Sequence, residues 1–166
     1  MQPADRTKHV LDRAQSFTNR VRVRKEEAHR HFEAYHYPEC VLAAQEGLEF
    51  LLKAVSLLLI NEYPREHKID DKRFPAFLKK VMAAVPPEIT YPDVARIIFL
   101  ARFWGEFYLT AKYGMEATGT TPDRLFKREE AELALKHLDS VAYDAQPFWT
   151  WRQRNPLPAA GGGEEQ

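Results

Sequence analysis

The chain has 166 residues, of which 45% are hydrophobic and 29% charged, a composition that excludes an intrinsically disordered protein and fits one globular domain. Its 24 basic and 24 acidic side chains cancel, so any binding to nucleic acid must come from a local patch rather than an overall positive field. A single cysteine, Cys40, excludes an internal disulfide and a cysteine-based zinc site.

The lone cysteine fits a reducing cytosol, and we therefore expect a cytoplasmic protein. The first ten residues, MQPADRTKHV, lack the apolar run of a secretion signal. The stretch from Leu48 to Ile60 contains Lys53 and is shorter than the roughly 18 residues that suggest a membrane-spanning helix. The Pro- and Gly-rich run NPLPAAGGGEEQ is typical of disorder. We predict one domain over residues 1–152, a disordered tail over 153–166, and no membrane segment.

Apolar side chains at three- and four-residue steps predict helices along most of the chain. The first carries a stripe from Val10 to Tyr35 and ends before Pro38, because proline is not tolerated in a helix interior. The second is apolar on nearly every side and therefore buried. The second to fifth helices are predicted over about 39–62, 74–85, 92–113 and 128–149. This order predicts an all-α, up-and-down antiparallel bundle of four to five helices.

Polar side chains interrupt the two most apolar of these helices. Four on the second helix recur at steps of four, four and three residues, which places them in one strip: Gln45, Glu49, Lys53 and Ser56. On the fourth helix Arg102 and Glu106 stand four residues apart. Since a charge in apolar surroundings needs a partner, we predict that Glu49 pairs with Arg102 across the two helices. The local pairs Glu49–Lys53 and Arg102–Glu106 are the simpler structural alternative.

The second predicted helix resembles a motif of the HEPN domain family. Its run AAQEGLEFLLKA, residues 43–54, has a Gln, a Glu and then a Lys-Ala pair within a hydrophobic helix, as the family's second helix does. His67 matches a histidine of the loop that follows, and Tyr108–Gly114 is similar to the aromatic and basic end of the family's next long helix. Pro122 and the run Glu129–Ala134 resemble the start of its last helix. The matches occur in order over about residues 28–150.

The resemblance implies a helical bundle that commonly dimerises. Many relatives are RNA-cleaving toxins encoded beside a small nucleotidyltransferase antitoxin, and others are non-catalytic modules that bind nucleotides or RNA. Catalytic relatives carry an Arg, four to six residues and then a His on the fourth long helix. Here Arg102 stands in that region, but Tyr108 follows at an Arg-x5-Tyr spacing and no histidine is present. Tyrosine, with a pKa of about 10, is a poor proton acceptor near neutral pH, so the sequence shows no evident base for RNA cleavage.

Three functions therefore compete. The first is a HEPN-like nucleotide- or RNA-binding protein without a cofactor, a homodimer and the partner of a minimal nucleotidyltransferase. Its candidate ligand-binding residues are Glu49, Lys53, Lys112 and Tyr113. The second is a metal-independent RNA-cleaving toxin, whose candidate catalytic residues are Arg102, Glu106 and Tyr108. The third is a non-catalytic structural dimer, whose polar strips only hold the bundle and the dimer together. Tyr108, Lys112 and Tyr113 fit a dimer interface as well as a groove that stacks a base.

Two further clusters on the first helix have simpler explanations. The basic run at Arg20, Arg22, Arg24 and Lys25 suits RNA phosphates, but Glu26 and Glu27 follow at once and favour a solvated helix face. His29 and His31 point away from each other on a helix, unlike the i, i+4 pairs that bind metal, so we predict solvated histidines, His36 included, and no metal site.

Overall fold

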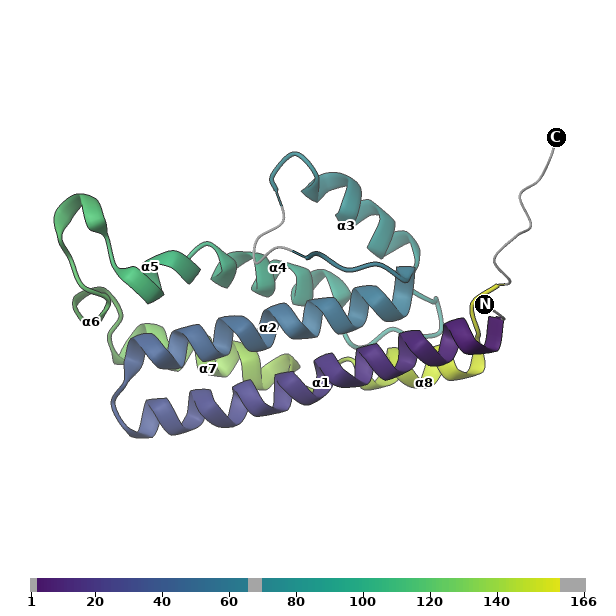
Figure 1. The fold of residues 1–166 in the computed structure, drawn as a ribbon, viewed down its shortest axis with the longest axis horizontal. Helices are drawn as coiled ribbons and strands as arrows, with labels where there is room; N and C mark the ends of the chain where they lie inside the picture. The colour runs from purple at the N-terminus through teal and green to yellow at the C-terminus, as the bar shows by residue number, and fades with distance from the viewer. Residues whose placement is uncertain (1–2, 66–69, 159–166) are drawn as a thin grey trace.

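The computed structural model describes residues 3–65 and 70–158, and it is all-α over those residues (Figure 1). Met115 and Thr120 form an isolated bridge, and the described residues contain no strand. The elements are α1 (Pro3–Glu33), α2 (Tyr37–Ile60), α3 (Phe74–Ala83), α4 (Val94–Gly105), α5 (Tyr108–Tyr113), the 3-10 turn η1 (Glu116–Thr118), α6 (Pro122–Leu125), α7 (Arg128–Val141) and α8 (Gln146–Arg154). No helix among the described residues is long and apolar enough to cross a membrane.

The helices form the predicted up-and-down bundle. In Figure 1, α1 and α2 run antiparallel along the length of the molecule, and the path of the chain then reverses again in α4–α5 and in α7–α8. Helix α3 lies outside these four rods (Figure 1). The apolar stripe of α1 faces the core, since Val10, Ala14 and Val21 are buried. The predicted architecture is therefore confirmed.

Helix α2 is the centre of the bundle. It packs against α1, α7 and α4, and nearly every residue from Cys40 to Leu59 is buried, as its all-round apolar sequence predicts. Pro38 lies in its first turn, where the missing N–H has no intrahelical partner to lose. Because Gly47 lacks a Cβ, α7 approaches closely: a Cβ there would lie 2.9 Å from Leu138 Cδ1.

Two helices predicted as continuous are broken. The fifth divides into α7 and α8 because Pro147 lies in the first turn of α8, and a proline inside a continuous helix would remove a hydrogen bond and clash with the preceding turn. The fourth divides at Glu106–Phe107, directly after Gly105, which weakens a helix interior. The turn places the Phe107 ring 5.9 Å from Trp104 and 6.4 Å from Phe126.

Helix α8 closes the bundle against the end of α2. The Arg152 guanidinium is buried and donates from Nε to the Leu58 carbonyl at 2.7 Å and from Nη2 to the Leu59 carbonyl at 3.0 Å. These carbonyls belong to the last turn of α2, which has no intrahelical donors for them. Burial lowers the pKa of Arg152.

Helix α8 extends two residues beyond the predicted domain boundary at residue 152. Beyond the helix, the Leu157 N–H donates to Thr7 Oγ1 at 2.9 Å. Residues 159–166 of the predicted tail lie outside the described range.

Candidate functional site

Arg102 occupies the last turn of α4 and reaches toward the start of α3. Its Nη2 lies 2.9 Å from Asp71 Oδ1, and its guanidinium carbon lies 3.9 Å from the centre of the Phe74 ring. The side chain is 38% exposed, so the ion pair lies at the surface. Arg102 is thus held on two sides, by a carboxylate and by an aromatic face, and both partners come from one short segment.

Both partners that the sequence suggested for Arg102 are wrong. No ion pair joins Arg102 to Glu49 or to Glu106, all of which are described residues. Glu49 pairs with Lys53 on its own helix, where a four-residue step already places the two charges together. Arg102 turns toward Asp71 and Phe74, 31 and 28 positions earlier, and no local spacing indicates a contact over that separation.

Tyr108, Lys112 and Tyr113 come together on α5. Lys112 Nζ donates to the Tyr108 hydroxyl at 3.4 Å and lies 5.5 Å and 5.3 Å from the ring centres of Tyr108 and Tyr113. The hydrogen bonds to Tyr108 and Tyr113 raise the pKa of Lys112. Lys112 is exposed and Tyr113 is 61% exposed, so an ammonium group beside two phenol rings faces solvent. We call these three residues the α5 cluster.

The three residues predicted as catalytic do not lie on one continuous helix. The turn at Glu106–Phe107 separates Arg102, in α4, from Tyr108, the first residue of α5. Glu106 is exposed at the end of α4, and Arg102 makes no hydrogen bond to it or to Tyr108. The Arg-x5-Tyr spacing therefore does not lie on one continuous helix.

The polar strip of α2 is buried, as predicted. Glu49 is 7% and Lys53 9% exposed, and Lys53 Nζ donates to Glu49 Oε1 at 2.6 Å. Gln45 Nε2 donates to Glu49 Oε2 at 3.3 Å, while the buried Gln45 Oε1 has no hydrogen-bond partner. Ser56 Oγ donates to the Leu52 carbonyl at 2.6 Å, which satisfies the hydroxyl within the helix. The Glu49–Lys53 pair thus forms, and its predicted ligand-binding role stays a prediction.

The histidines and the cysteine offer little additional chemistry. His29, predicted as solvated, instead contacts Asp139 of α7, with 3.0 Å between Nε2 and Oδ1. The described residues contain no group of three or more His, Cys, Asp and Glu that could hold a metal. Burial raises the pKa of Cys40 to about 12, so its thiol is protonated and a poor nucleophile at neutral pH.

The family to which the chain belongs follows from its sequence profile. The profile of the HEPN domain matches residues 14–143, which include most of α1, all of α2 to α7, the α4–α5 turn and the α5 cluster. The chain belongs to the HEPN family. The histidine match at His67 lies outside the described residues.

A structural comparison agrees with this assignment at the level of the fold. The HEPN chain is similar to the crystal structure of TT1696 from Thermus thermophilus, with a TM-score of 0.59 and 20% identity over 82% of this chain and 98% of that one. At that identity the likeness concerns the fold alone. No curated protein matches the chain.

Sequence reasoning missed the partners of Arg102. Asp71 lies in a connector that is polar throughout, so nothing distinguishes it from its neighbours. Phe74 has the position of an ordinary apolar residue at the start of α3. Only the packing of α3 beside α4 brings these groups to the arginine.

Proposed function

We propose that this HEPN chain is a nucleotide- or RNA-binding protein that acts as the partner of a minimal nucleotidyltransferase. The α5 cluster carries the proposal. An ammonium group has three donors for phosphate oxygens, and an exposed tyrosine ring offers a face on which a base can stack. Lys112 is charged at neutral pH even at an ordinary lysine pKa of about 10.4, and this positive charge favours an anionic ligand.

RNA cleavage has weaker support. The charge of Arg102 is already balanced by Asp71, and no hydrogen bond or ion pair joins its guanidinium to Glu106 or Tyr108, both described residues. Cleavage without a metal needs a group that accepts the proton of the 2′-hydroxyl, and among the described residues Asp71 is the one carboxylate paired with Arg102. Binding by the α5 cluster needs no proton transfer, so it requires no such base.

A homodimer is part of the proposal. Phe99 and Phe103 lie four residues apart on α4 with ring centres 6.0 Å apart, and Phe99 is 58% exposed. Leu109, at the start of α5, is also exposed. An exposed apolar stripe of this kind is typical of a surface that a second chain covers. Light scattering should show a dimer, and Phe99→Glu should convert it to a monomer; a monomeric wild type would contradict this part.

The nucleotidyltransferase partner follows from family membership rather than from a contact of this chain. A short nucleotidyltransferase reading frame beside the gene would support it. Co-purification of the two proteins after co-expression is the direct test, and failure to form a complex would remove this part of the proposal.

Binding assays with fluorescent single-stranded and hairpin RNA, and with ATP, test the α5 cluster. We expect Lys112→Met to weaken binding about tenfold, because it removes a charge-assisted hydrogen bond to phosphate. Tyr113→Ala should weaken RNA binding about fivefold or more through lost stacking. Lys136→Met is the matched control, since Lys136 is an exposed lysine already paired with Glu132 at 2.9 Å.

The same RNA samples, analysed on a gel without added metal, separate binding from cleavage. Intact RNA with wild type and with Arg102→Ala supports the binding function. Cleavage by wild type that Arg102→Ala abolishes would establish the toxin alternative instead. Equal binding by Lys112→Met and Lys136→Met would contradict the proposed role of the α5 cluster.

A further inference from the structure

The basic side chains of α1 fall into two classes. Three of those in the predicted basic run have carboxylate partners: Arg22 Nη1 lies 2.7 Å from Glu26, Arg24 Nε lies 2.6 Å from Glu46 and a second nitrogen contacts Glu27, and Lys25 lies 3.2 Å from Asp139. These charges are balanced within the protein. As predicted, Glu26 and Glu27 reduce the positive charge of this part of the basic run.

Arg13 and Arg20 belong to the second class. The Arg13 guanidinium lies 5.0 Å from the centre of the Tyr63 ring, and that of Arg20 lies 5.3 Å from the centre of the Phe50 ring. Neither forms an ion pair with a carboxylate of the described residues. Each is exposed, so its donors are open to solvent while its guanidinium lies against an aromatic ring.

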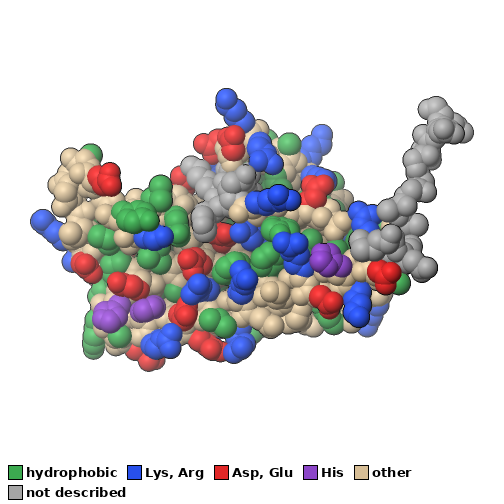
Figure 2. Space-filling view, viewed as in Figure 1, with side chains coloured by type: hydrophobic (Ala, Val, Ile, Leu, Met, Phe, Trp, Pro, Cys, Tyr) green, Lys and Arg blue, Asp and Glu red, His purple; other side chains and the backbone are tan. Residues whose placement is uncertain are grey.

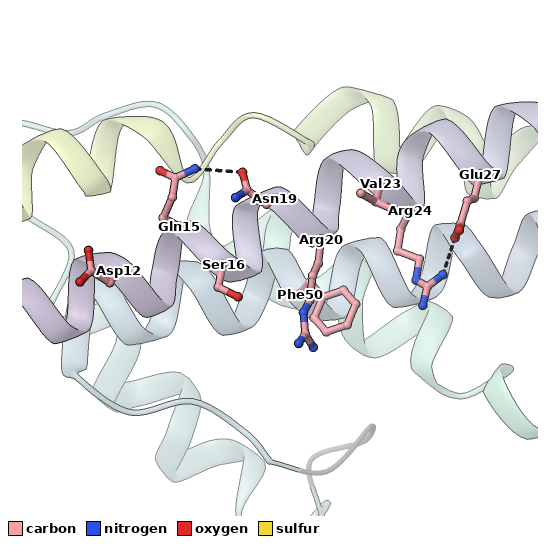
Figure 3. A pocket seen from close by; sticks show the side chains of 9 residues that line it. All are labelled: Asp12, Gln15, Ser16, Asn19, Arg20, Val23, Arg24, Glu27 and Phe50. Atoms are coloured by element: carbon pink, nitrogen blue, oxygen red, sulfur yellow. Dashed lines mark hydrogen bonds and ion pairs between the residues drawn. The ribbon is translucent and has the colours of Figure 1, made fainter.

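The two arginines lie on one face of the molecule. Arg13 and Arg20 are seven positions apart, which is about two helical turns, or roughly 10 Å along α1. Between them Phe17 contacts both rings, with centres 6.2 Å from Phe50 and 5.0 Å from Tyr63. The rings therefore form a continuous aromatic base that supports both guanidinium groups. Figure 3 shows Arg20 lying against Phe50, while Arg24 is bound to Glu27.

Shallow hollows flank both arginines. One of about 660 Å³ lies along α1 and includes Arg20 and Phe50 (Figure 3). Its lining also contains two carboxylates, Asp12 and Glu27, of which Glu27 is paired with Arg24. A second hollow, of about 600 Å³, includes Arg13 and Tyr63.

A third hollow continues the basic surface to α3. It has a volume of about 410 Å³ and shares Tyr63 and Arg73 with the second. Its lining adds Lys72, and among the described residues Glu62 is the carboxylate that lines it, paired with Lys80 at 2.7 Å. In Figure 2, blue side chains gather across this face between α1 and α3. We call the residues Arg13, Arg20, Lys72 and Arg73 the basic face.

We infer that the basic face binds the phosphate backbone of single-stranded RNA. The guanidinium groups of Arg13 and Arg20 lie against aromatic rings and have no carboxylate partners among the described residues. Their donors match phosphate oxygens, and the exposed side of each can stack on an unpaired base. Cations beside aromatic rings in shallow grooves, as at Arg13 and Arg20, are the arrangement that binds single strands with little dependence on sequence.

The lining favours nucleic acid over an acidic protein. Protein interfaces have an apolar core, whereas interfaces with nucleic acid are more polar and much more positively charged. The first hollow offers only Phe50 and Val23 as apolar side chains, and Arg20 already covers part of Phe50. The hollow around Arg20 thus offers positive charge for RNA and little apolar surface to anchor a protein.

This inference deepens the proposed function by adding a second surface, formed by α1 and the start of α3 rather than by α5, and it rests on that proposal for the class of ligand. The test is fluorescence anisotropy with an oligo(U) of about 12 nucleotides, a length within the usual site size for single strands, labelled at its 5′ end, over a range of salt concentrations. Arg13→Gln/Arg20→Gln should weaken binding at least tenfold and reduce the salt slope by about 1.4, since each lost phosphate contact on a single strand lowers it by about 0.7.

The matched control is Arg22→Gln/Arg30→Gln, which removes two charges from the same helix where Glu26 and Glu27 already balance them. It should bind within about twofold of wild type, and circular dichroism melts confirm that both double variants are folded. Equal weakening by the two variants would overturn the inference, because it would reflect net charge alone. Oligo(U) binding that is unchanged in Arg13→Gln/Arg20→Gln, or absent in wild type, would also overturn it.

Two further comparisons identify the site and the ligand. Weakening by Lys112→Met alone overturns the inference and leaves the proposed function standing, whereas weakening by Arg13→Gln/Arg20→Gln alone supports the inference and overturns the role of the α5 cluster. A polyglutamate peptide of matched charge should not displace the RNA. Displacement by that peptide, lost in the same variant, would overturn the inference in favour of an acidic protein partner.

Discussion

The polar strip of α2 and the surface around Arg102 begin with the same sequence signal, a charged residue in an apolar helix. Glu49 and Lys53 are buried and pair with each other within one helix. Arg102 is 38% exposed, and its partners come from the start of α3. A buried pair satisfied within its own helix holds the bundle together, while an exposed charge held by a distant segment remains accessible to a ligand.

Breaking the buried pair should have the largest effect. Glu49→Ala leaves the Lys53 ammonium buried without its carboxylate, which we expect to lower the free energy of unfolding by about 3–5 kcal/mol. Urea denaturation measures this loss. Glu132→Ala, which breaks an exposed pair with the same four-residue spacing, should cost much less, because solvent screens that pair.

A rescue variant keeps that prediction testable when Glu49→Ala fails to fold. Glu49→Leu/Lys53→Met replaces the pair with apolar side chains, and we expect it to be more stable than Glu49→Ala. Equal losses of unfolding free energy for Glu49→Ala and Glu132→Ala would contradict the prediction, because the Glu49–Lys53 pair would then contribute no more than a surface ion pair.

Arg152 tests a buried charge whose partners are carbonyl groups. Arg152→Met leaves the Leu58 and Leu59 carbonyls without these donors and should cost about 2–3 kcal/mol. Thermal denaturation of this variant beside Arg154→Met, a change in the same last turn at an exposed position, measures the difference. Similar melting temperatures for the two variants would show that Arg152 does not stabilise the end of α2.

Arg102→Met should cost much less than either buried change. An exposed ion pair contributes up to about 1 kcal/mol and a cation–π contact at an exposed site about 0.5–1 kcal/mol, so we expect a total near 1 kcal/mol in urea denaturation. Asp71→Asn should show a comparable loss, since it breaks the same pair. A loss above about 3 kcal/mol, the range of a broken buried pair, would mean that Arg102 serves the bundle as Glu49 does.

The smallest effect concerns His137, whose Nδ1 accepts a hydrogen bond from Trp104 Nε1 at 3.0 Å. Burial and the nearby Arg96 lower the pKa of His137, so the unfolded chain takes up a proton before the folded chain does. The contribution of His137 to stability is therefore present above the ordinary histidine pKa of about 6.5 and decreases as the pH falls below it. His137→Gln cannot take up that proton, and its stability relative to wild type should rise between about pH 7.5 and about pH 5.5, which bracket that value. Urea denaturation at the two pH values measures the change, and a constant difference would contradict the prediction.

The helices were largely predictable because they depend on local periodicity. Helix α2 was predicted over 39–62 and spans 37–60, and the start of α3 at Phe74 matches. Pro147 was a visible signal for the break before α8 that the apolar stripe obscured. The break after Gly105 has no comparably strong signal, since the turn also depends on the packing of Phe107 against Trp104 and Phe126.

The sequence by itself determined the all-α bundle, the buried strip of α2 and the family, because apolar spacing and short motifs act over a few residues. Only the tertiary structure decided which charges meet. In the folded chain, Arg102 pairs with Asp71 and contacts Phe74. Arg13 and Arg20 lie against Tyr63 and Phe50, whereas Arg22 and Arg24 pair with carboxylates. These contacts depend mainly on how helices distant in the sequence pack together. The attraction between two charges depends on their separation in space, which their separation in the sequence does not determine.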